Sequence, residues 1–207
     1  MQSRPLPPLR VVTDRAGSYI PASDAEIIDA FARGDRRAAA LVYDRLLVAV
    51  DSTLYRVIGR READHDDLVQ AAFEQIIITL TRRRFAGGCT LHGWAAAITC
   101  NVALNAIRSR RRSRRVFDTD AEAESRGGRA HHDVEAQVSA RRELERLRGH
   151  LAAMDPDRAQ TVLLHDVFGT SLAETAKLTG VSMTAAQSRL ARGRKDLRER
   201  MIREDAE

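Results

Sequence analysis

The chain has 207 residues, of which 43% are hydrophobic and 30% charged, with a net charge of +5. This length fits one large domain or two small ones. Aromatic residues make up only 4%, which favours helices over a strand-rich fold. Two cysteines give no disulfide framework, and neither a long apolar run nor a signal-peptide core stands in the sequence. We therefore expect a cytoplasmic protein without membrane insertion.

The charges are arranged in blocks. Nine arginines and no acidic residue lie between Arg82 and Arg115, whereas Val116 to Gln137 carries six acids against two arginines. Basic residues dominate again from Arg189 to Arg203. Two basic blocks separated by an acidic one indicate two nucleic-acid contacts joined by a linker, although solvated helix faces explain any single block equally well.

The first predicted helices follow a proline-rich start. Residues 1–22 contain four prolines and no periodicity, so we expect a loose extension. Ser23 and Glu26 have the spacing of a capping box and open a helix that ends near Gly34. A second helix begins near Arg36 and continues to about Ile58.

Two more helices complete the first half. Apolar residues between Asp66 and Thr81 form one stripe at helical spacing, and acids at the start suit the helix dipole. Gly87 and Gly88 mark a loop. A fourth helix then runs from about Trp94 into the arginines at 108–115.

Periodicity disappears over the acidic stretch and resumes near Val138, after which four helices are expected. The predicted fold is therefore all-α, with two small helical domains joined by a flexible linker. We expect an N-terminal extension at residues 1–22 and a first helical domain at residues 23–115. An acidic linker at residues 116–137 joins it to a second helical domain at residues 138–207.

The second domain contains the pattern of a helix-turn-helix. Ser171 and Glu174 form a second capping box, Gly180 tolerates positive φ in the turn, and Ser182 caps the last helix. A generic helical hairpin shows the same pattern. Polar and basic residues on the last helix favour a recognition helix in the major groove, where arginine reads guanine and other cations meet phosphates. The expected DNA contacts of this helix are Thr184, Gln187, Ser188, Arg189, Arg192, Arg194 and Lys195.

Several motifs of this half resemble region four of extracytoplasmic-function (ECF) sigma factors, a group of the sigma-70 family of bacterial RNA polymerase sigma factors. They include residues 154–158, 171–176, 180–182 and 188–194. The resemblance implies that the DNA contacts named for the last helix bind the promoter −35 element, and that the module also binds the flap of the polymerase β subunit. The chain departs from the usual pattern at Ala185, Ala186 and Gln187, so its −35 preference is expected to be unusual.

The first half resembles region two of the same family. Residues 67–70 with Phe73 are similar to the start of the helix that docks on the clamp helices of the β′ subunit, although Ala71 replaces a usual glutamate. An ordinary amphipathic core helix is the alternative. The resemblance implies core polymerase contacts at Asp67, Leu68, Gln70, Phe73 and Glu74.

The arginine-rich part resembles the family's loop and helix for the −10 element. In the family, this loop captures a flipped base of the non-template strand, and an asparagine contributes to the reading. Trp94 is better interpreted as a core anchor than as a base-stacking ring, and Ala96 to Cys100 departs from the family's usual sequence. The implied −10 contacts are Arg84, Phe85, Gly87, Gly88, Asn101, Arg108 and Arg111.

The resemblance spans about residues 24–112 and 138–201 and implies a non-enzymatic sigma factor without cofactors. Its implied partners are core RNA polymerase, promoter DNA and an anti-sigma factor. A dimeric helix-turn-helix regulator that binds duplex DNA without polymerase is the main alternative. A metal-dependent enzyme acting on nucleic acid is a third hypothesis, because Cys89, His92 and Cys100 contain metal-binding groups, but we expect no metal.

Overall fold

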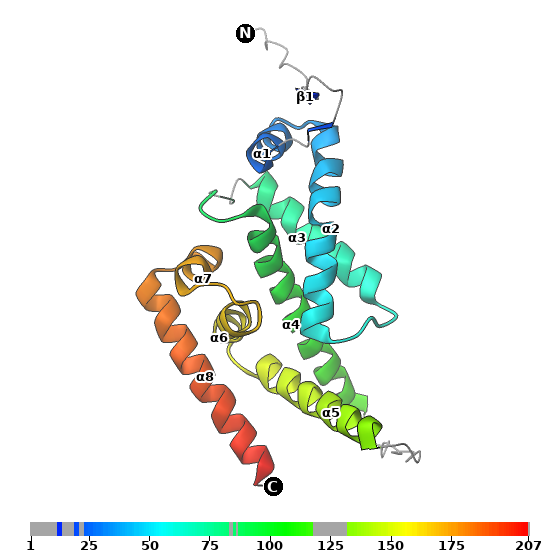
Figure 1. Cartoon of the computed structure of the whole chain (residues 1–207), viewed down its shortest axis with the longest axis vertical. Coiled ribbons are helices and arrows are strands. Elements are labelled where there is room, and N and C mark those ends of the chain that lie inside the picture. The colour runs from blue at the N-terminus through cyan, green and yellow to red at the C-terminus, as the bar shows by residue number, and fades with distance from the viewer. Residues whose placement is uncertain are drawn as a thin grey trace.

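The computed structural model describes residues 12–13, 19–20, 23–82, 85, 87–117 and 132–206. These residues form an all-α fold apart from one short strand pair, which confirms the predicted fold class (Figure 1). The helical segments are α1 (Asp24–Ala32), α2 (Arg36–Ile58), α3 (His65–Thr81), α4 (Leu91–Phe117), α5 (His132–Ala153), α6 (Pro156–Val162), the π-helix η1 (Leu163–Val167), α7 (Leu172–Thr179) and α8 (Met183–Asp205).

The strand pair differs from the expectation of a loose extension. Strands β1 (Val12–Thr13) and β2 (Tyr19–Ile20) are antiparallel, with Val12 opposite Ile20 and Thr13 opposite Tyr19. All four residues are β-branched or aromatic, and such residues favour extended backbone. The remaining residues of the predicted 1–22 extension lie outside the described ones.

The predicted helix starts are confirmed by their caps. The Ser23 hydroxyl accepts the N–H of Glu26 at 3.3 Å, and the Glu26 carboxylate accepts the Ser23 N–H at 2.7 Å. Ser171 and Ser182 each accept the N–H three residues further on, at 3.2 Å. These bonds satisfy N–H groups that the first turn of a helix leaves without a partner.

The helix boundaries differ from the predicted ones mainly around the linker. Helix α4 continues to Phe117 and α5 already begins at His132, inside the stretch expected to be irregular. Residues 118–131, the middle of the predicted linker, lie outside the described part of the chain. The division into two domains therefore stays a prediction.

Helix α4 lies at the centre of the first four helices, with α2 packed along it and α3 and α1 completing the bundle (Figure 1). The core of this bundle consists of apolar side chains that are at most 1% exposed. They include Ile27, Leu46, Leu54, Ile76, Leu91 and Leu104.

The second half contains the predicted helix-turn-helix. Helix α7 ends at Gly180, whose φ of +68° is left-handed, and α8 follows after a short turn. Ala176 and Ala186 are buried where the two helices meet, as the small-residue spacing predicts. Helices α5 and α6 pack against α8 from the side opposite to its exposed face.

The two halves are packed against each other rather than separated. Helix α4 contacts α5, α6 and α7, and one continuous cluster of buried apolar residues runs through both halves. In Figure 1, α5 crosses the lower end of α4. Contacts between residues far apart in the chain produce no periodic pattern in the sequence, so the sequence does not predict them.

A close approach of α8 to α6 depends on Gly193. A β-carbon at this position would lie 2.7 Å from the Val162 Cγ2 and 3.2 Å from the Arg158 carbonyl oxygen. Overpacking a core typically costs about 1–3 kcal/mol. Replacing glycine by alanine inside a helix stabilises the folded state by roughly 1 kcal/mol, because alanine has the higher helix propensity.

We predict that Gly193→Ala lowers the free energy of unfolding by about 1–2 kcal/mol, because the clash outweighs the propensity gain. Urea denaturation followed by circular dichroism measures the change. In the double variant Gly193→Ala/Val162→Ala the loss should be smaller than the sum of the single losses, since the clashing methyl is gone. Additive losses would contradict the predicted contact.

Candidate nucleic-acid interfaces

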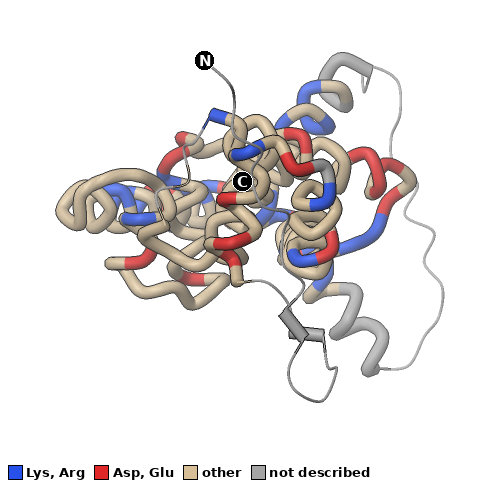
Figure 2. Tube along the Cα trace, turned by 90° about the horizontal axis from the view of Figure 1, so that it is seen from above, with Lys and Arg blue, Asp and Glu red and all other residues tan. Residues whose placement is uncertain are grey.

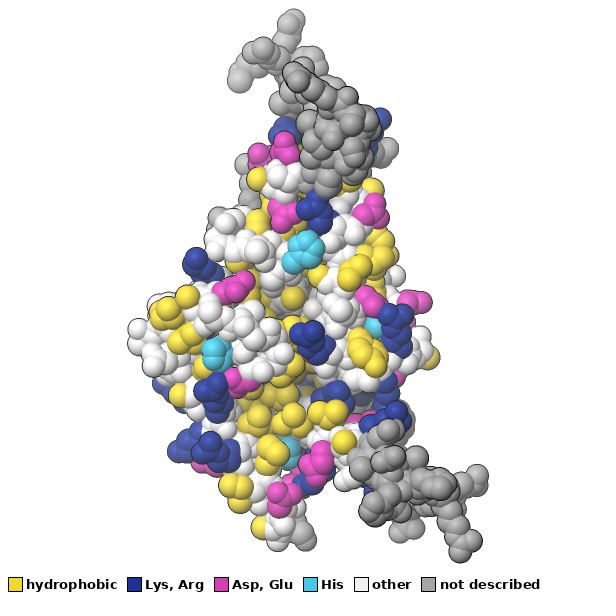
Figure 3. Space-filling model, viewed as in Figure 1, with side chains coloured by type: hydrophobic (Ala, Val, Ile, Leu, Met, Phe, Trp, Pro, Cys, Tyr) yellow, Lys and Arg dark blue, Asp and Glu magenta, His cyan; other side chains and the backbone are white. Residues whose placement is uncertain are grey.

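The exposed face of α8 carries most of the predicted −35 contacts. Thr184, Gln187, Arg192 and Lys195 are exposed, and Ser188 is half-buried. Apolar residues on the opposite side, among them Leu190, hold the helix against the rest of the half. Figure 3 shows basic side chains gathered at the lower left, over α8. The structure thus brings these five residues together on one helix.

Arg189 and Arg194 lie at the flanks of this face, where they form ion pairs within the chain. Arg189 contacts Asp157 of α6 at 2.5 Å. Arg194 donates twice to Asp166, from Nε at 3.0 Å and from Nη2 at 2.5 Å, and this bonding raises the pKa of Arg194. Both arginines are predicted DNA contacts, and no spacing in the sequence indicates their acidic partners.

Asp166 owes its position to η1. The Phe168 N–H donates to the Leu163 carbonyl at 3.0 Å, a spacing of five residues rather than four. This wider turn follows directly on α6 and precedes the helix-turn-helix. Such segments are frequent at functional sites, and nothing in the residue pattern signals them.

The predicted −10 loop joins α3 to α4. Phe85 is half-buried and packs edge-on against Trp94, with ring centroids 5.1 Å apart. Trp94 is only 8% exposed, which supports the core-anchor interpretation. Gly87 and Gly88 are exposed with open space around them. Arg84 lies outside the described residues.

Phe85 also borders a surface hollow of about 430 Å³ between α1 and the end of α3. Its other described lining residues are Ile28, Asp29, Ala32, Arg33 and Leu80. The hollow combines an apolar wall with one acidic and one basic side chain. An unstacked base has a flat apolar face and polar edges, so the chemistry of the wall fits one.

Asn101 is exposed on α4. Asn105, Arg108 and Arg112 follow it at spacings of four, seven and eleven residues and share its stripe of the helix. Asn105, which the sequence analysis did not select, accepts from Arg108 Nη1 at 3.1 Å. Its spacing of four residues from Asn101 on one helix is the feature of the sequence that indicates a shared face.

Arg108 and Arg111, which are predicted to contact promoter DNA, bind the end of α5 in this structure. Arg108 Nε donates to the Ala152 carbonyl at 2.8 Å, and Arg111 donates to the Gly149 carbonyl. Partial burial lowers the pKa of Arg108. In this structure these two arginines are therefore bound by the other half of the chain, whereas Arg112 beside them is exposed.

The predicted polymerase face lies on α3. Asp67, Gln70 and Glu74 are exposed, and Gln70 donates to Glu74 at 3.1 Å. Ile78, missed by the sequence analysis, is 41% exposed and continues the face at helical spacing. The face thus combines acidic, amide and apolar groups.

The two other predicted members of this face lie deeper. Leu68 is half-buried, and Phe73 is 8% exposed with its ring 4.5 Å from that of Tyr43. Phe73 therefore supports the face from within the core instead of presenting its own ring. The apolar stripe of α3 did not reveal this difference in depth.

No cluster of three or more metal-binding side chains occurs among the described residues. Cys100 is fully buried, which raises the pKa of its thiol to about 12, and burial also raises that of Cys89. Protonated, separated thiols bind metal poorly. In the described helices, no segment is long and apolar enough to cross a membrane.

Family comparisons match both halves of the chain. The model described as Sigma-70 region 2 covers residues 42–113, and that described as Sigma-70, region 4 covers residues 144–197.

Individual relatives agree with these matches. RNA polymerase sigma factor CnrH of Cupriavidus metallidurans is 30% identical over 80% of this chain and 87% of its own. ECF RNA polymerase sigma factor SigE of Mycolicibacterium smegmatis is 27% identical over 85% of this chain and 67% of its own. A solved structure of CnrH with the cytosolic domain of CnrY covers 86% of this chain and 97% of its own, at 23% identity and a TM-score of 0.48.

These matches agree with the helix-turn-helix and with a second basic surface, which a dimeric regulator does not need. The chain belongs to the ECF group of sigma-70 family RNA polymerase sigma factors, which bind RNA polymerase and recognise promoters.

Proposed function

We propose that this sigma factor selects promoters through α8 at the −35 element and through the α3–α4 loop and α4 at the −10 element. The observation that supports the proposal is the pair of separate polar and basic surfaces on one chain. One is the exposed face of α8, and the other is the stripe of α4 on which Asn101 and Arg112 are exposed. Arg192 and Lys195 leave α8 toward solvent, and neither is buried in the core. The division into residues 1–22, 23–115, 116–137 and 138–207 belongs to this proposal.

At the −35 element, α8 enters the major groove with its N-terminal half. Thr184, Gln187 and Arg192 are placed to meet base edges, whereas Lys195 meets phosphate. Arg189 and Arg194 act in one of two ways. They leave Asp157 and Asp166 to bind DNA, or these carboxylates keep the two guanidinium groups oriented toward DNA. Exposed ion pairs contribute only about 0–1 kcal/mol, so a phosphate competes with them readily.

At the −10 element, a base of the opened strand enters the hollow beside Phe85. Extruding a base costs a few kcal/mol, and stacking on an aromatic ring returns about 1–3 kcal/mol per base. Phe85 is the one described aromatic ring that borders this hollow. A single stacking ring makes the protein dependent on a well-matched promoter, with Asn101 reading the adjacent strand.

The exposed face of α3 docks on the clamp helices of polymerase β′, and the second half docks on the β flap. We further propose that the protein acts in the cytoplasm without catalysis or cofactor. An anti-sigma factor is the expected regulator, in line with the CnrH structure, which contains the cytosolic domain of CnrY.

Transcription in vitro tests the function itself. Purified chain, core polymerase and a genomic DNA library should yield a small set of start sites that share one −35 and one −10 sequence. The two elements need not be palindromic, in contrast to the sites of a dimeric regulator. Random initiation equal to that of core polymerase alone would refute promoter selection.

Asn101→Ala should lower transcription from the cognate promoter by about tenfold or more, because a lost base contact costs about 1–3 kcal/mol. Holoenzyme formation should stay unchanged, since Asn101 is exposed on α4 and does not belong to the proposed polymerase face of α3. Ser109→Ala, at an exposed position on the same helix, serves as the control. Equal transcription by both variants would exclude Asn101 from promoter reading.

Asp67→Ala combined with Gln70→Ala should weaken binding to core polymerase by about tenfold, because two exposed polar contacts are lost. Fluorescence anisotropy of the labelled chain with core polymerase measures the Kd. Asp66→Ala removes a neighbouring acid from the same helix turn but from a different face, and should change little. If the Asp66 variant is as weak as the double variant, helix charge and not the docking face is responsible.

A further inference from the structure

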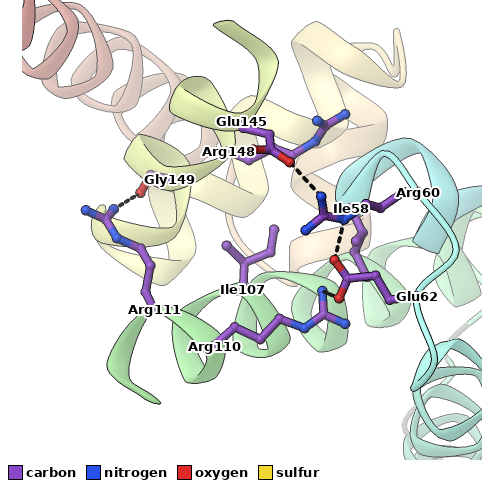
Figure 4. Close-up of a pocket in the computed structure, with 9 residues that line it drawn as sticks. All are labelled: Ile58, Arg60, Glu62, Ile107, Arg110, Arg111, Glu145, Arg148 and Gly149. Carbon is purple, nitrogen blue, oxygen red and sulfur yellow. Dashed lines mark hydrogen bonds and ion pairs between the residues drawn. The ribbon is translucent and has the colours of Figure 1, made fainter. Parts of the chain in front are cut away.

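Two adjoining hollows lie where α5 meets the end of α2. The larger has a volume of about 630 Å³ and the smaller one of about 110 Å³, and both are lined by Ile58, Arg60, Glu145 and Arg148. Figure 4 shows the smaller hollow, with Ile107 in the middle and arginines from α4, α5 and the α2–α3 turn around it. Pockets for small molecules typically measure about 300–1,000 Å³, so the larger hollow has the size of a ligand site.

The described walls of the two hollows, which we together call the arginine groove, are strongly basic. Their charged residues are Arg60, Arg61, Glu62, Arg110, Arg111, Arg141, Glu145 and Arg148. Arg60, Arg61 and Arg110 form ion pairs with nearby carboxylates. The other three arginines have no carboxylate partner within the described part of the chain. The arginine groove therefore has an excess of positive charge, which suits an anionic ligand.

Arg148 is the arginine best placed to bind an anion. Its Nε donates to the Val57 carbonyl at 2.9 Å, and its guanidinium lies over Gly59, where a β-carbon would overlap it. A guanidinium carries five N–H donors, and the Nη groups of Arg148 meet no acceptor among the described residues. Partial burial lowers the pKa of Arg148. Glu145 bonds to Arg60 at 2.9 Å, which leaves the Nη groups of Arg148 to a ligand.

The larger hollow also has an aromatic and apolar wall. Tyr55 is 54% exposed and Leu144 is 47% exposed, and both side chains line the hollow. An exposed tyrosine ring offers a stacking surface to any flat base, because every base has a π-face. Inorganic phosphate has no group that such a wall would contact. The combination of arginines with an aromatic ring and a leucine therefore favours a nucleotide over a simple anion.

We propose that the arginine groove binds a nucleotide with two or three linked phosphates, its phosphates on Arg148 and Arg141 and its base against Tyr55 and Leu144. Planar guanidinium groups bind phosphate oxygens in pairs, which makes arginine the suitable residue at this place. None of these four side chains is assigned above to promoter DNA or to polymerase. The nucleotide site thus goes beyond the proposed function and does not depend on it.

Isothermal titration calorimetry of the full-length chain with ATP and with GTP tests the proposal. Arg148→Ala and Arg141→Ala should each weaken binding about tenfold, because each removes a charge-assisted bond to phosphate. Arg142→Ala is the matched control, since it removes a neighbouring exposed arginine that lines neither hollow. Equal losses in the Arg141 and Arg142 variants would reveal unspecific attraction and overturn the site, as would the absence of saturable binding to the wild-type chain.

A gain of affinity is a result that damage to the fold does not produce. Glu145→Gln removes a negative charge from the wall and should tighten binding of ATP and GTP about threefold. Glu143→Gln removes an exposed carboxylate from the same helix outside the groove and should change the affinity little. Equal gains in the two variants would attribute binding to net charge and contradict a defined site.

The base contact is tested apart from the phosphate contact. Tyr55→Leu should weaken ATP and GTP about tenfold and leave the binding of inorganic triphosphate unchanged, because the ring stacks on the base alone. Inorganic triphosphate that binds the wild-type chain as tightly as ATP would overturn the assignment to a nucleotide. Binding of oligo-dT that Arg141→Ala and Tyr55→Leu both weaken, without binding of ATP or GTP, would assign the groove to a nucleic-acid strand and likewise overturn the proposal.

Discussion

The rest of the structure depends on the packing of the other helices against the apolar side of α4. Leu91, Cys100 and Leu104 on this helix are at most 1% exposed, and α2, α3, α5, α6 and α7 all pack against it. Burial of apolar surface is the dominant favourable contribution to folding, and here one helix supplies it to both halves. Arg108 and Arg111 near the end of α4 are consequently held at the junction, where they contact α5.

Charge balance explains how such a basic protein stays folded without a polyanion. Figure 2 shows acidic and basic residues interspersed along the described chain. Arg110 is paired with Asp64 at 2.6 Å and with Glu62 at 2.8 Å, and the flanking arginines of α8 have their own acids. These partners limit repulsion between the basic side chains.

Local features of the fold were predictable from the sequence, because they depend on neighbours in the chain. The serine caps at Ser23, Ser171 and Ser182, the turn at Gly180 and the exposed face of α8 all follow from spacing of a few residues. The family resemblance supplied the roles of the two halves, and the family matches confirm it.

Features that depend on distant residues were not predictable. The pairing of Arg194 with Asp166, the burial of Phe73 and the binding of Arg108 to α5 are set by tertiary packing. The π-helix that positions Asp166 has no residue signature. The sequence thus identified which side chains carry charge, whereas their partners required the three-dimensional structure.

The most direct measurement is the exchange of arginine side-chain protons in the free, full-length protein by nitrogen-15 NMR. The Arg108 Nε–H, assigned by its loss in Arg108→Lys, should exchange with water much more slowly than that of the exposed Arg112. Equal, rapid exchange at Arg108 and Arg112 in the wild-type chain would contradict the seating of α5 on α4.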